Sequence, residues 1–362
     1  MNAQSANAKA DKLVSDVIEI ENDPWALYEL SMEQKWGDGV PLLPPTDQRI
    51  EAMLAATPLK SSDIVVEEMP PRHGTATVEL VAINAVMAGC EPRALPLVIA
   101  ALQAIDQPGY NGFGLSTTTG SVTPMLIVNG PTRDELGIEY RAGCLGGASG
   151  RGSMTIGRAV ALCLRNIGGQ RAGDSSRTVF GQPGRFGMCF AEWEERSDWP
   201  ALATRRGFKP GEEVVTVHGG MGVMPICDVN SESDYDRAYL IGKCIAHPLH
   251  NMYVTGMQPP GEVVVLVNPV WAERFAKTFP KIESLQECLH EGAWQPIDMW
   301  PESSQKLLHE RKRVDSRGRV YAMMGPQKIV PVVCGGLGNL HATLLTSWGE
   351  SEMQSMAVRR PK

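Results

Sequence analysis

"TPMLIVNGPTRDELG", residues 123–137, joins a buried strand to a helix and so indicates the fold class. Its run MLIV is unbroken and apolar, which is typical of a strand covered on both faces. Asn129 and Gly130 then predict a turn, and Pro131 suits the first position of a helix. A strand that leads directly into a helix predicts an α/β protein with at least partly parallel sheets.

Two pairs of similar phrases suggest that the second half of the chain repeats the first. The phrase "LIVNGPTRDEL" at 126–136 resembles "VLVNPVWAERF" at 265–275. The phrase "EVVTVHGGMGVM" at 213–224 resembles "KIVPVVCGGLGNLH" at 328–341, because each is a β-branched run that ends among glycines. We interpret the chain as two α/β lobes with partly parallel sheets flanked by helices, and an internal duplication is one explanation of the likeness.

A change in composition marks the boundary between the two lobes. Residues 168–212 are rich in Gly, Arg and acidic residues and show little periodicity, which is typical of a segment that joins two units or serves a site. The predicted organisation is a flexible N-terminus (1–22), an N-terminal lobe with a Gly-rich loop (23–172), a linker (173–212), a C-terminal lobe (213–350) and a flexible tail (351–362).

Composition limits the classes of partner. The chain has 362 residues, of which 43% are hydrophobic, and a net charge of −7 with scattered Lys and Arg, so we expect no nucleic acid. No apolar stretch approaches the ~18 residues that span a bilayer, and residues 1–22 lack the apolar region of a signal peptide. We therefore expect a cytoplasmic protein that binds a small molecule, no membrane and no nucleic acid. We also expect a homo-oligomer, and a protein partner is left open.

A Gly-rich loop, "AGCLGGASGRGS" at 142–153, precedes an apolar helical run at about 153–167. It is not a P-loop, because Ser153 stands where Lys is required, and it is not a dinucleotide fingerprint, because Thr155 stands where the third glycine is required. Inward-facing amides at the start of a helix nevertheless bind anions. The candidate substrate-binding residues are Gly146, Gly147, Ser149, Gly150, Arg151, Gly152 and Ser153.

Two other interpretations accompany this loop. Its glycines alone could serve a crossover in which helix and strand pack closely. The stretch "GLSTTTGS" at 114–121 is a second donor-rich turn, and Thr118 and Thr119 are candidate substrate-binding residues there.

The eight cysteines, at 90, 144, 163, 189, 227, 244, 288 and 334, contain no Cys-x-x-Cys pair and are expected to be free thiols. Cys90 precedes a helix that Pro92 is predicted to open, and a helix N-terminus favours the thiolate, whereas the neighbouring Glu91 opposes it. Cys90 is therefore the leading candidate for a catalytic thiol. The alternative is a packed cysteine at a corner between two helices.

Three further residues are candidate catalytic groups. Cys189 is followed by the acidic residues of "AEWEE", which include possible acid or base partners. Cys334 and His218 end the two similar β-branched phrases, so a duplication would present them at related positions as a nucleophilic pair.

A metal site is the second chemical hypothesis. Cys244, His247 and His250 follow one another at intervals of three residues in "CIAHPLHNM", and such ligands suit zinc or copper. Pro248 interrupts the helix that would align them, so a helix end with hydrogen-bonded histidines is the alternative.

Long phrases of the chain resemble a bacterial family without established chemistry. They are "WGDGVPLLPPT", "ATVELVAINAVMAGCEPRALPLV", "LIVNGPTRDELGI", "TIGRAVALCLRNIGG" and "CFAEWEE". The family is loosely labelled thioredoxin-like and is associated with selenoproteins that carry a Sec-Gly-Ser-Cys motif. The resemblance implies thiol chemistry and places Cys90 and Cys189 inside shared phrases, although the chain lacks the Cys-x-x-Cys of a thioredoxin site.

These observations lead to one expected function and two alternatives. We expect an enzyme that acts on a small anionic organic substrate through a reactive cysteine thiol, Cys90 first, and the Gly-rich anion-binding loop. A metal-dependent lyase or hydrolase with Cys/His ligands is the first alternative, and a non-catalytic binding subunit of a hetero-complex is the second. No nucleotide motif indicates a cofactor.

Overall fold

The computed structural model describes residues 13–146, 150–247 and 261–361 and confirms an α/β fold. Its main element is a seven-stranded sheet in the order β4-β3-β5-β10-β6-β9, with β11 paired to β5. The strands are β3 (Thr123–Asn129), β4 (Met188–Ala191), β5 (Val214–Cys227), β6 (Val263–Val267), β9 (Ile329–Val333), β10 (His341–Ser347) and β11 (Gln354–Ala357). Strands of both halves thus join a single sheet.

The two halves of the sheet have the same topology. In the first, β3 leads through helices to the parallel strand β4, and β5 then returns antiparallel to β3. In the second, β6 leads through helices to the parallel strand β9, and β10 returns antiparallel to β6. The central strands β5 and β10 pair with each other and join the halves. The likeness between 126–136 and 265–275 therefore matches equivalent strands, β3 and β6.

The other pair of similar phrases is not equivalent in the structure, and that prediction is wrong. Residues 214–224 belong to β5, whereas 329–333 form β9, which corresponds to β4. A β-branched run followed by glycines fits both an antiparallel strand that continues through its glycines and a parallel strand that ends at them. Only strand pairing distinguishes the two. His218 and Cys334 therefore do not occupy related positions.

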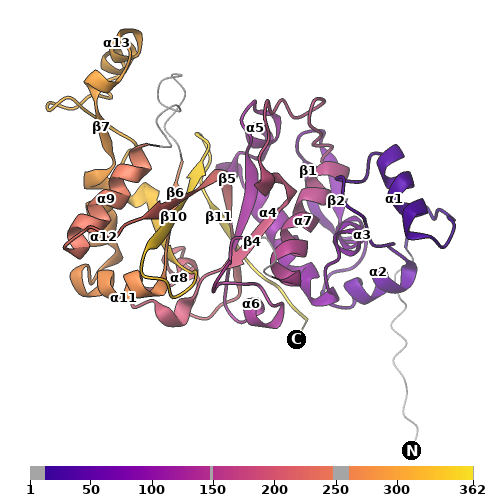
Figure 1. The fold of residues 1–362 in the computed structure, drawn as a ribbon. Helices are drawn as coiled ribbons and strands as arrows, with labels where there is room; N and C mark the ends of the chain where they lie inside the picture. Colours follow the sequence, from indigo (N-terminus) through magenta and orange to yellow (C-terminus); the bar gives the residue numbers. More distant parts are fainter. Residues whose placement is uncertain (1–12, 147–149, 248–260, 362) are drawn as a thin grey trace, which may run out of the picture.

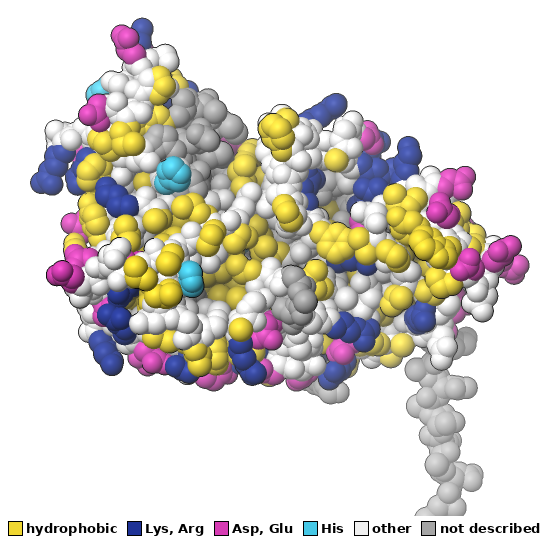
Figure 2. All heavy atoms as spheres, in the orientation of Figure 1, with side chains coloured by type: hydrophobic (Ala, Val, Ile, Leu, Met, Phe, Trp, Pro, Cys, Tyr) yellow, Lys and Arg dark blue, Asp and Glu magenta, His cyan; other side chains and the backbone are white. Residues whose placement is uncertain are grey.

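Helices cover the outer face of the sheet in both of its halves (Figure 1). The first half carries α3 (Val78–Ala88), α4 (Leu95–Ile105) and α7 (Arg151–Asn166). The second half carries α9 (Asp234–Ala246), α11 (Pro269–Thr278) and α12 (Ile282–Gly292). Each set packs with outward-facing strand residues into its own core, for example Leu126 in the first and Val265 in the second. One core lies in each half of the sheet, but β4 falls inside the predicted linker at 173–212, so this segment contributes a strand to the sheet. Figure 2 shows hydrophobic side chains along the hollow between the two halves.

Shorter elements complete the described chain. They are α1 (Pro24–Glu33), α2 (Asp47–Leu54), β1 (Ile64–Met69), β2 (Gly74–Thr77), α5 (Gly112–Thr117), α6 (Thr132–Glu135), α8 (Leu202–Arg205), β7 (Trp294–Pro296), α13 (Glu302–Glu310) and β8 (Arg319–Tyr321). Among the described helices, none is long and apolar enough to cross a membrane.

The sheet is curled so that its two outermost strands approach each other. Beyond β4, the amide of Trp193 donates to the carbonyl of Val333 at the end of β9, at 2.7 Å. The strand residues that face the inside of the curled sheet form a third apolar cluster, which includes Ile127, Phe190, Leu266 and Val332. Because β3, β4 and β9 all bring their carboxyl ends to this junction, side chains that follow them in sequence meet there.

Both predicted flexible ends contain ordered contacts within the described residues. The amides of Val14 and Ser15 donate to Glu79 on α3, while residues 1–12 lie outside the described part. The predicted tail at 351–362 contains β11, which pairs with β5 in register from Gln354 to Ala357, so that prediction is wrong. β11 has only four residues, which are too few to show the alternation of a strand in the sequence.

Replacing Gly157 by alanine tests how closely α7 packs on β4. A Cβ at this position would lie 2.5 Å from the Met188 nitrogen, so the helix and the strand would have to separate. We expect Gly157→Ala to lower the free energy of unfolding by about 1–3 kcal/mol in urea titrations, the usual cost of overpacking. The control is Gly222→Ala, whose nearest neighbour would lie 3.7 Å away and which should change stability little. Equal stability of the two variants would contradict the close packing.

Candidate functional site

Two cysteines meet at the carboxyl end of the sheet. The Sγ atoms of Cys144 and Cys334 lie 3.7 Å apart, and both side chains belong to the cluster inside the curled sheet. Cys334 directly follows β9, and its amide donates to the carbonyl of Val267 at 3.1 Å, which extends the pairing with β6 by one residue. Cys144 comes from the loop that precedes α7. The two thiols are thus 190 residues apart in sequence and adjacent in space.

Backbone hydrogen bonds place the Cys144 loop over the strand ends. The carbonyl of Glu139 accepts from the amide of Ala191 at the end of β4, at 3.1 Å, and the carbonyl of Tyr140 accepts from Gly335 after β9, at 2.8 Å. Gly143 then turns the chain with a φ of 74°, a conformation that glycine adopts without strain. The loop therefore bridges the two edge strands and presents Cys144 to Cys334.

The contact makes the two thiols unequal. Once Cys144 has lost its proton, the S–H group of Cys334 donates to it, and this hydrogen bond lowers the pKa of Cys144 despite burial and the charge of Glu139. The same hydrogen bond and burial raise the pKa of Cys334 well above its usual value, and the charge of Glu192 adds to the effect. Cys144 is therefore the thiol that ionises first, and Cys334 is its proton-bearing partner.

A cation–aromatic stack borders the pair. Tyr140 lies between two guanidinium groups, with Arg133 at 4.5 Å and Arg141 at 4.8 Å from its ring centroid, and its ring meets Trp193 edge-on at 5.6 Å. Arg133 is buried and bonded to the acidic residues after β4, whereas Arg141 is exposed. Arg141 thus offers a solvent-facing positive charge on the loop that carries Cys144.

Glu192 is a buried carboxylate at the same end of the sheet. It accepts from Asn129 Nδ2 and from the Leu202 amide, each at 2.7 Å, and burial raises its pKa. The pattern "AEWEE" therefore contributes a structural carboxylate that anchors α8 beside the junction. It does not contribute a partner for Cys189.

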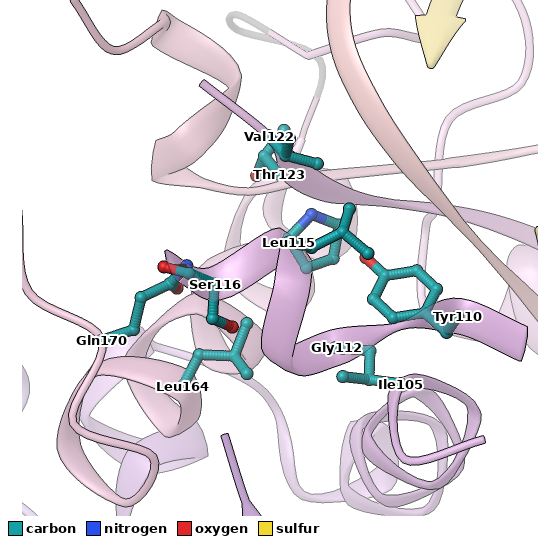
Figure 3. Close-up of a pocket in the computed structure, with 10 residues that line it drawn as sticks. Ile105, Tyr110, Gly112, Leu115, Ser116, Val122, Thr123, Leu164 and Gln170 are labelled. Atoms are coloured by element: carbon teal, nitrogen blue, oxygen red, sulfur yellow. Dashed lines mark hydrogen bonds between the residues drawn. The ribbon is translucent and has the colours of Figure 1, made fainter. Parts of the chain in front are cut away.

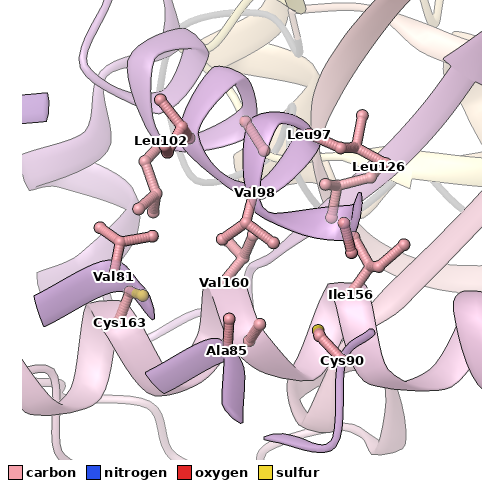
Figure 4. Packing of buried hydrophobic residues seen from close by; sticks show 14 of the residues in the cluster. Val81, Ala85, Cys90, Leu97, Val98, Leu102, Leu126, Ile156, Val160 and Cys163 are labelled. Atoms are coloured by element: carbon pink, nitrogen blue, oxygen red, sulfur yellow. The ribbon is translucent and has the colours of Figure 1, made fainter. Parts of the chain in front are cut away.

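The structure places Cys90 in the core, which is the alternative interpretation of this residue. Its side chain is 5% exposed, its Sγ donates to the Thr155 carbonyl at 3.3 Å, and burial raises its pKa to about 12. Figure 4 shows it among the apolar side chains of the first-half core. Pro92 opens a short 3₁₀ turn (Pro92–Ala94), and α4 begins only at Leu95, so no α-helix N-terminus stabilises a Cys90 thiolate.

The remaining catalytic candidates do not come together. Cys189 on β4 packs in the outer core, where burial raises its pKa above the ordinary range. His218 on β5 lies 3.3 Å from the Thr346 carbonyl, and burial lowers its pKa to about 4, so it is a neutral core histidine. Cys334 contacts Cys144 in place of His218, and the predicted Cys–His pair is wrong.

The first turn of α7 makes several contacts with the preceding chain. A Cβ on Gly152 would lie 2.2 Å from the Leu136 carbonyl, so this turn packs directly on neighbouring backbone. Arg151 donates to the Gly89 carbonyl at 2.9 Å, and the Ser153 hydroxyl accepts from the Glu139 amide at 2.8 Å. Gly152 therefore serves close packing, as the alternative interpretation of this loop expects, and the anion site at this helix end stays a prediction.

Other predicted binding residues lie elsewhere or outside the described chain. Gly147 and Ser149 are outside the described residues, and Gly146 is partly exposed. Thr118 and Thr119 precede β3, whereas the cysteine pair lies beyond its other end, about 20 Å away for a seven-residue strand. The second donor-rich turn is therefore separated from the cysteine pair by the length of a strand.

The predicted metal ligands are only partly described. Cys244 is half-buried in the last turn of α9, His247 is exposed just after it, and His250 lies outside the described residues. Within 13–146, 150–247 and 261–361, no group of three or more His, Cys, Asp or Glu residues could hold a metal ion. The zinc or copper site stays a prediction.

A pocket lies at the opposite end of β3 from the cysteine pair (Figure 3). It is lined by Tyr110, Leu115, Ser116, Thr123 and Gln170, among others, and Figure 3 shows the Tyr110 hydroxyl pointing inward, toward Leu115. Tyr110 is buried, and its hydroxyl has no hydrogen-bond partner among the described residues. This pocket borders the segment between α7 and β4.

Comparisons with protein-family models and with curated proteins found no match. The site must therefore be interpreted from its own chemistry. Sequence reasoning selected Cys334 and the Gly-rich loop but did not select Cys144 itself. The available signal was a cysteine inside a loop whose other residues are mostly small.

The pH dependence of alkylation tests the pairing of the two thiols. With the exposed Cys227 replaced by serine, we expect iodoacetamide to modify Cys144 with an apparent pKa below the usual 9.0, because Cys334 stabilises its thiolate. Cys334→Ala removes the donor and should raise the pKa of Cys144. Mass spectrometry of peptides after timed quenching measures both. Cys90→Ala is the control and should leave the profile unchanged, and an unshifted pKa in Cys334→Ala would contradict the assignment.

Proposed function

We propose that this protein is a thiol-dependent oxidoreductase that acts on small anionic disulfides through Cys144 and Cys334. The observation that carries the proposal is the 3.7 Å separation of the two Sγ atoms at the carboxyl end of the sheet. The proposal keeps the expected reactive thiol and anionic substrate and replaces Cys90 by Cys144.

The partner of Cys144 favours redox chemistry over hydrolysis. A cysteine that attacks a carbonyl carbon needs an adjacent base, usually histidine, to remove its proton and to protonate the leaving group. The side chain in contact with Cys144 Sγ is another thiol, and His218 bonds to the Thr346 carbonyl instead. Two neighbouring thiols can together give up two electrons and form a disulfide, as attack and resolution require.

The proposed reaction balances within the pair and one substrate. The Cys144 thiolate attacks one sulfur of the substrate disulfide, breaks the S–S bond and releases the first substrate thiolate. Cys334 then loses its proton to solvent and attacks Cys144 Sγ, which expels the second substrate thiolate and leaves a Cys144–Cys334 disulfide. The substrate is reduced by two electrons and the protein is oxidised by two. Two molecules of a thiol co-substrate return the pair to its reduced form by the reverse steps and leave as their own disulfide.

The residues around the cysteine pair favour an anionic substrate and require the loop that carries Cys144 to move. Arg141 faces solvent on the cysteine loop, so it would attract a negatively charged substrate. Cys144 and Cys334 are only 5% and 3% exposed, so the loop must swing outward for attack. Gly143 and Gly146, both with positive φ, are suitable pivots. The sulfurs must then approach to about 2.0 Å to close the disulfide.

The thiol inventory also supports a proposed cytoplasmic location. All eight cysteines are free, including the pair that lies close enough to react. Thiols persist in reducing compartments, and a catalytic dithiol there is returned to its reduced form by low-molecular-weight thiols.

A chromogenic dianionic disulfide, 5,5′-dithiobis(2-nitrobenzoic acid), tests the reaction. In a background with Cys227→Ser and Cys244→Ser, the two more accessible thiols are removed. We expect the pair to release two coloured thiolates per chain and to retain no adduct, because Cys334 resolves the mixed disulfide. Cys334→Ser should release one thiolate and keep a stable adduct on Cys144, as seen by mass spectrometry.

Two variants in the same background serve as controls for this experiment. Cys144→Ser should abolish the rapid release, and Cys90→Ser should react like the parent because its sulfur is sealed in the core. Rapid release of two thiolates by Cys144→Ser would overturn the proposal. A stable adduct in the unsubstituted pair would do the same.

A further inference from the structure

A group of arginines lies at the far end of α7 from the cysteine pair. Arg165 is in the last turn of the helix, and the amide of Gln170 donates to the Leu164 carbonyl at 2.9 Å, which brings Arg171 back beside it. Ser176 donates through its amide to the Arg171 carbonyl at 2.9 Å, and its hydroxyl accepts from Arg185 Nη2 at 3.2 Å. We call Arg165, Arg171 and Arg185 the arginine cluster.

The cluster has little negative charge around it. Within the described ranges, none of its three arginines forms an ion pair, whereas the more deeply buried Arg133, Arg158 and Arg237 each pair with carboxylates. The carboxylate that faces Arg165 is Asp38, and both of its oxygens are already bonded to Arg158, at 2.7 and 2.8 Å.

Partial burial makes this excess charge costly. Burial and the neighbouring Arg171 lower the pKa of Arg165, and burial lowers the pKa of Arg185. Both effects disfavour the charged form, yet a guanidinium keeps its proton at neutral pH. A ligand of opposite charge would relieve this cost, because Asp38, the carboxylate that acts on Arg165, is already bonded to Arg158.

Unused hydrogen-bond donors accompany the excess charge. The Nε atoms of Arg165 and Arg171 are both buried and have no acceptor among the described residues. A buried donor without an acceptor costs free energy that a bound oxygen would recover. The neighbouring pocket of Figure 3 contains the similarly unpartnered Tyr110 hydroxyl, and its Thr123 hydroxyl donates to the Gly184 carbonyl, next to Arg185, at 3.0 Å.

We propose that the arginine cluster binds a tetrahedral oxyanion of the phosphate type. Guanidinium groups match phosphate oxygens with paired N–H donors. A dianion offsets more of the charge of the neighbouring Arg165 and Arg171 than a single carboxylate does, and Arg185 is connected to them through Ser176. The donor-rich turn at 114–121 lies next to this site. The Val179 amide donates to the Thr119 carbonyl at 3.1 Å and so connects the turn to the segment between α7 and β4, which carries Arg171 and Arg185. This site is separate from the cysteine pair and does not depend on its chemistry.

Calorimetric titration of the full chain with inorganic phosphate and with pyrophosphate tests the proposal. We expect saturable binding with a dissociation constant of roughly 1 mM or below for at least one of them, against potassium chloride of matched ionic strength. Arg165→Gln and Arg171→Gln should each weaken binding at least about tenfold, because each removes a charged donor. Without ligand, both variants should melt at or above the parent temperature, because they remove an uncompensated charge.

Two matched controls make the outcome specific. Arg72→Gln removes an exposed arginine of the same region that is paired with Asp174, and it should bind phosphate like the parent. Cys144→Ser should also bind normally, so failure at either site can be recognised separately. The absence of saturable binding of both anions up to about 10 mM would overturn the proposal. Unchanged affinity in both Arg165→Gln and Arg171→Gln would do so equally.

Discussion

The curl of the central sheet is the constraint on which the rest of the structure depends. The six strands from β4 to β9 end in two edge strands, and here Trp193, which follows β4, donates to the carbonyl of Val333 at the end of β9. The curl converts one face of the sheet into an enclosed apolar interior, and α8 lies along the seam through Leu202.

The same curl accounts for the difference between the cysteines. Cys90, Cys189 and Cys334 are all buried, and burial alone raises the pKa of a thiol. Cys144 differs because a second thiol faces it across the junction and donates to its ionised form. A partner within hydrogen-bonding distance, more than exposure, therefore distinguishes the candidate nucleophile from core residues of the same type.

The two ends of β3 have different chemistry. At its carboxyl end, charged groups are matched, as Arg133 with its acidic neighbours, and the unusual feature is the thiol pair. Near its amino end, several buried polar groups have no hydrogen-bond partner among the described residues, namely the Nε atoms of Arg165 and Arg171 and the Tyr110 hydroxyl. Helix α7 runs between the two regions, and its Gly157 allows direct contact with β4, so the helix holds both regions at a defined separation. The two proposed sites therefore lie at opposite ends of the same helix.

The sequence alone determined the α/β class and the strand–turn–helix units at β3 and β6. These follow from local physics, because apolar runs, turn residues and helix-opening prolines act within a few positions of one another. The sequence could also indicate a Gly-rich loop and Cys334 as places of interest. It could not decide that the loop presents Cys144 to Cys334, that Cys90 is sealed in the core, or that β5 and β9 are not equivalent. Those outcomes depend on which strands pair and how far the sheet curls, and such contacts join residues as distant as 144 and 334, for which no local pattern in the chain carries a signal.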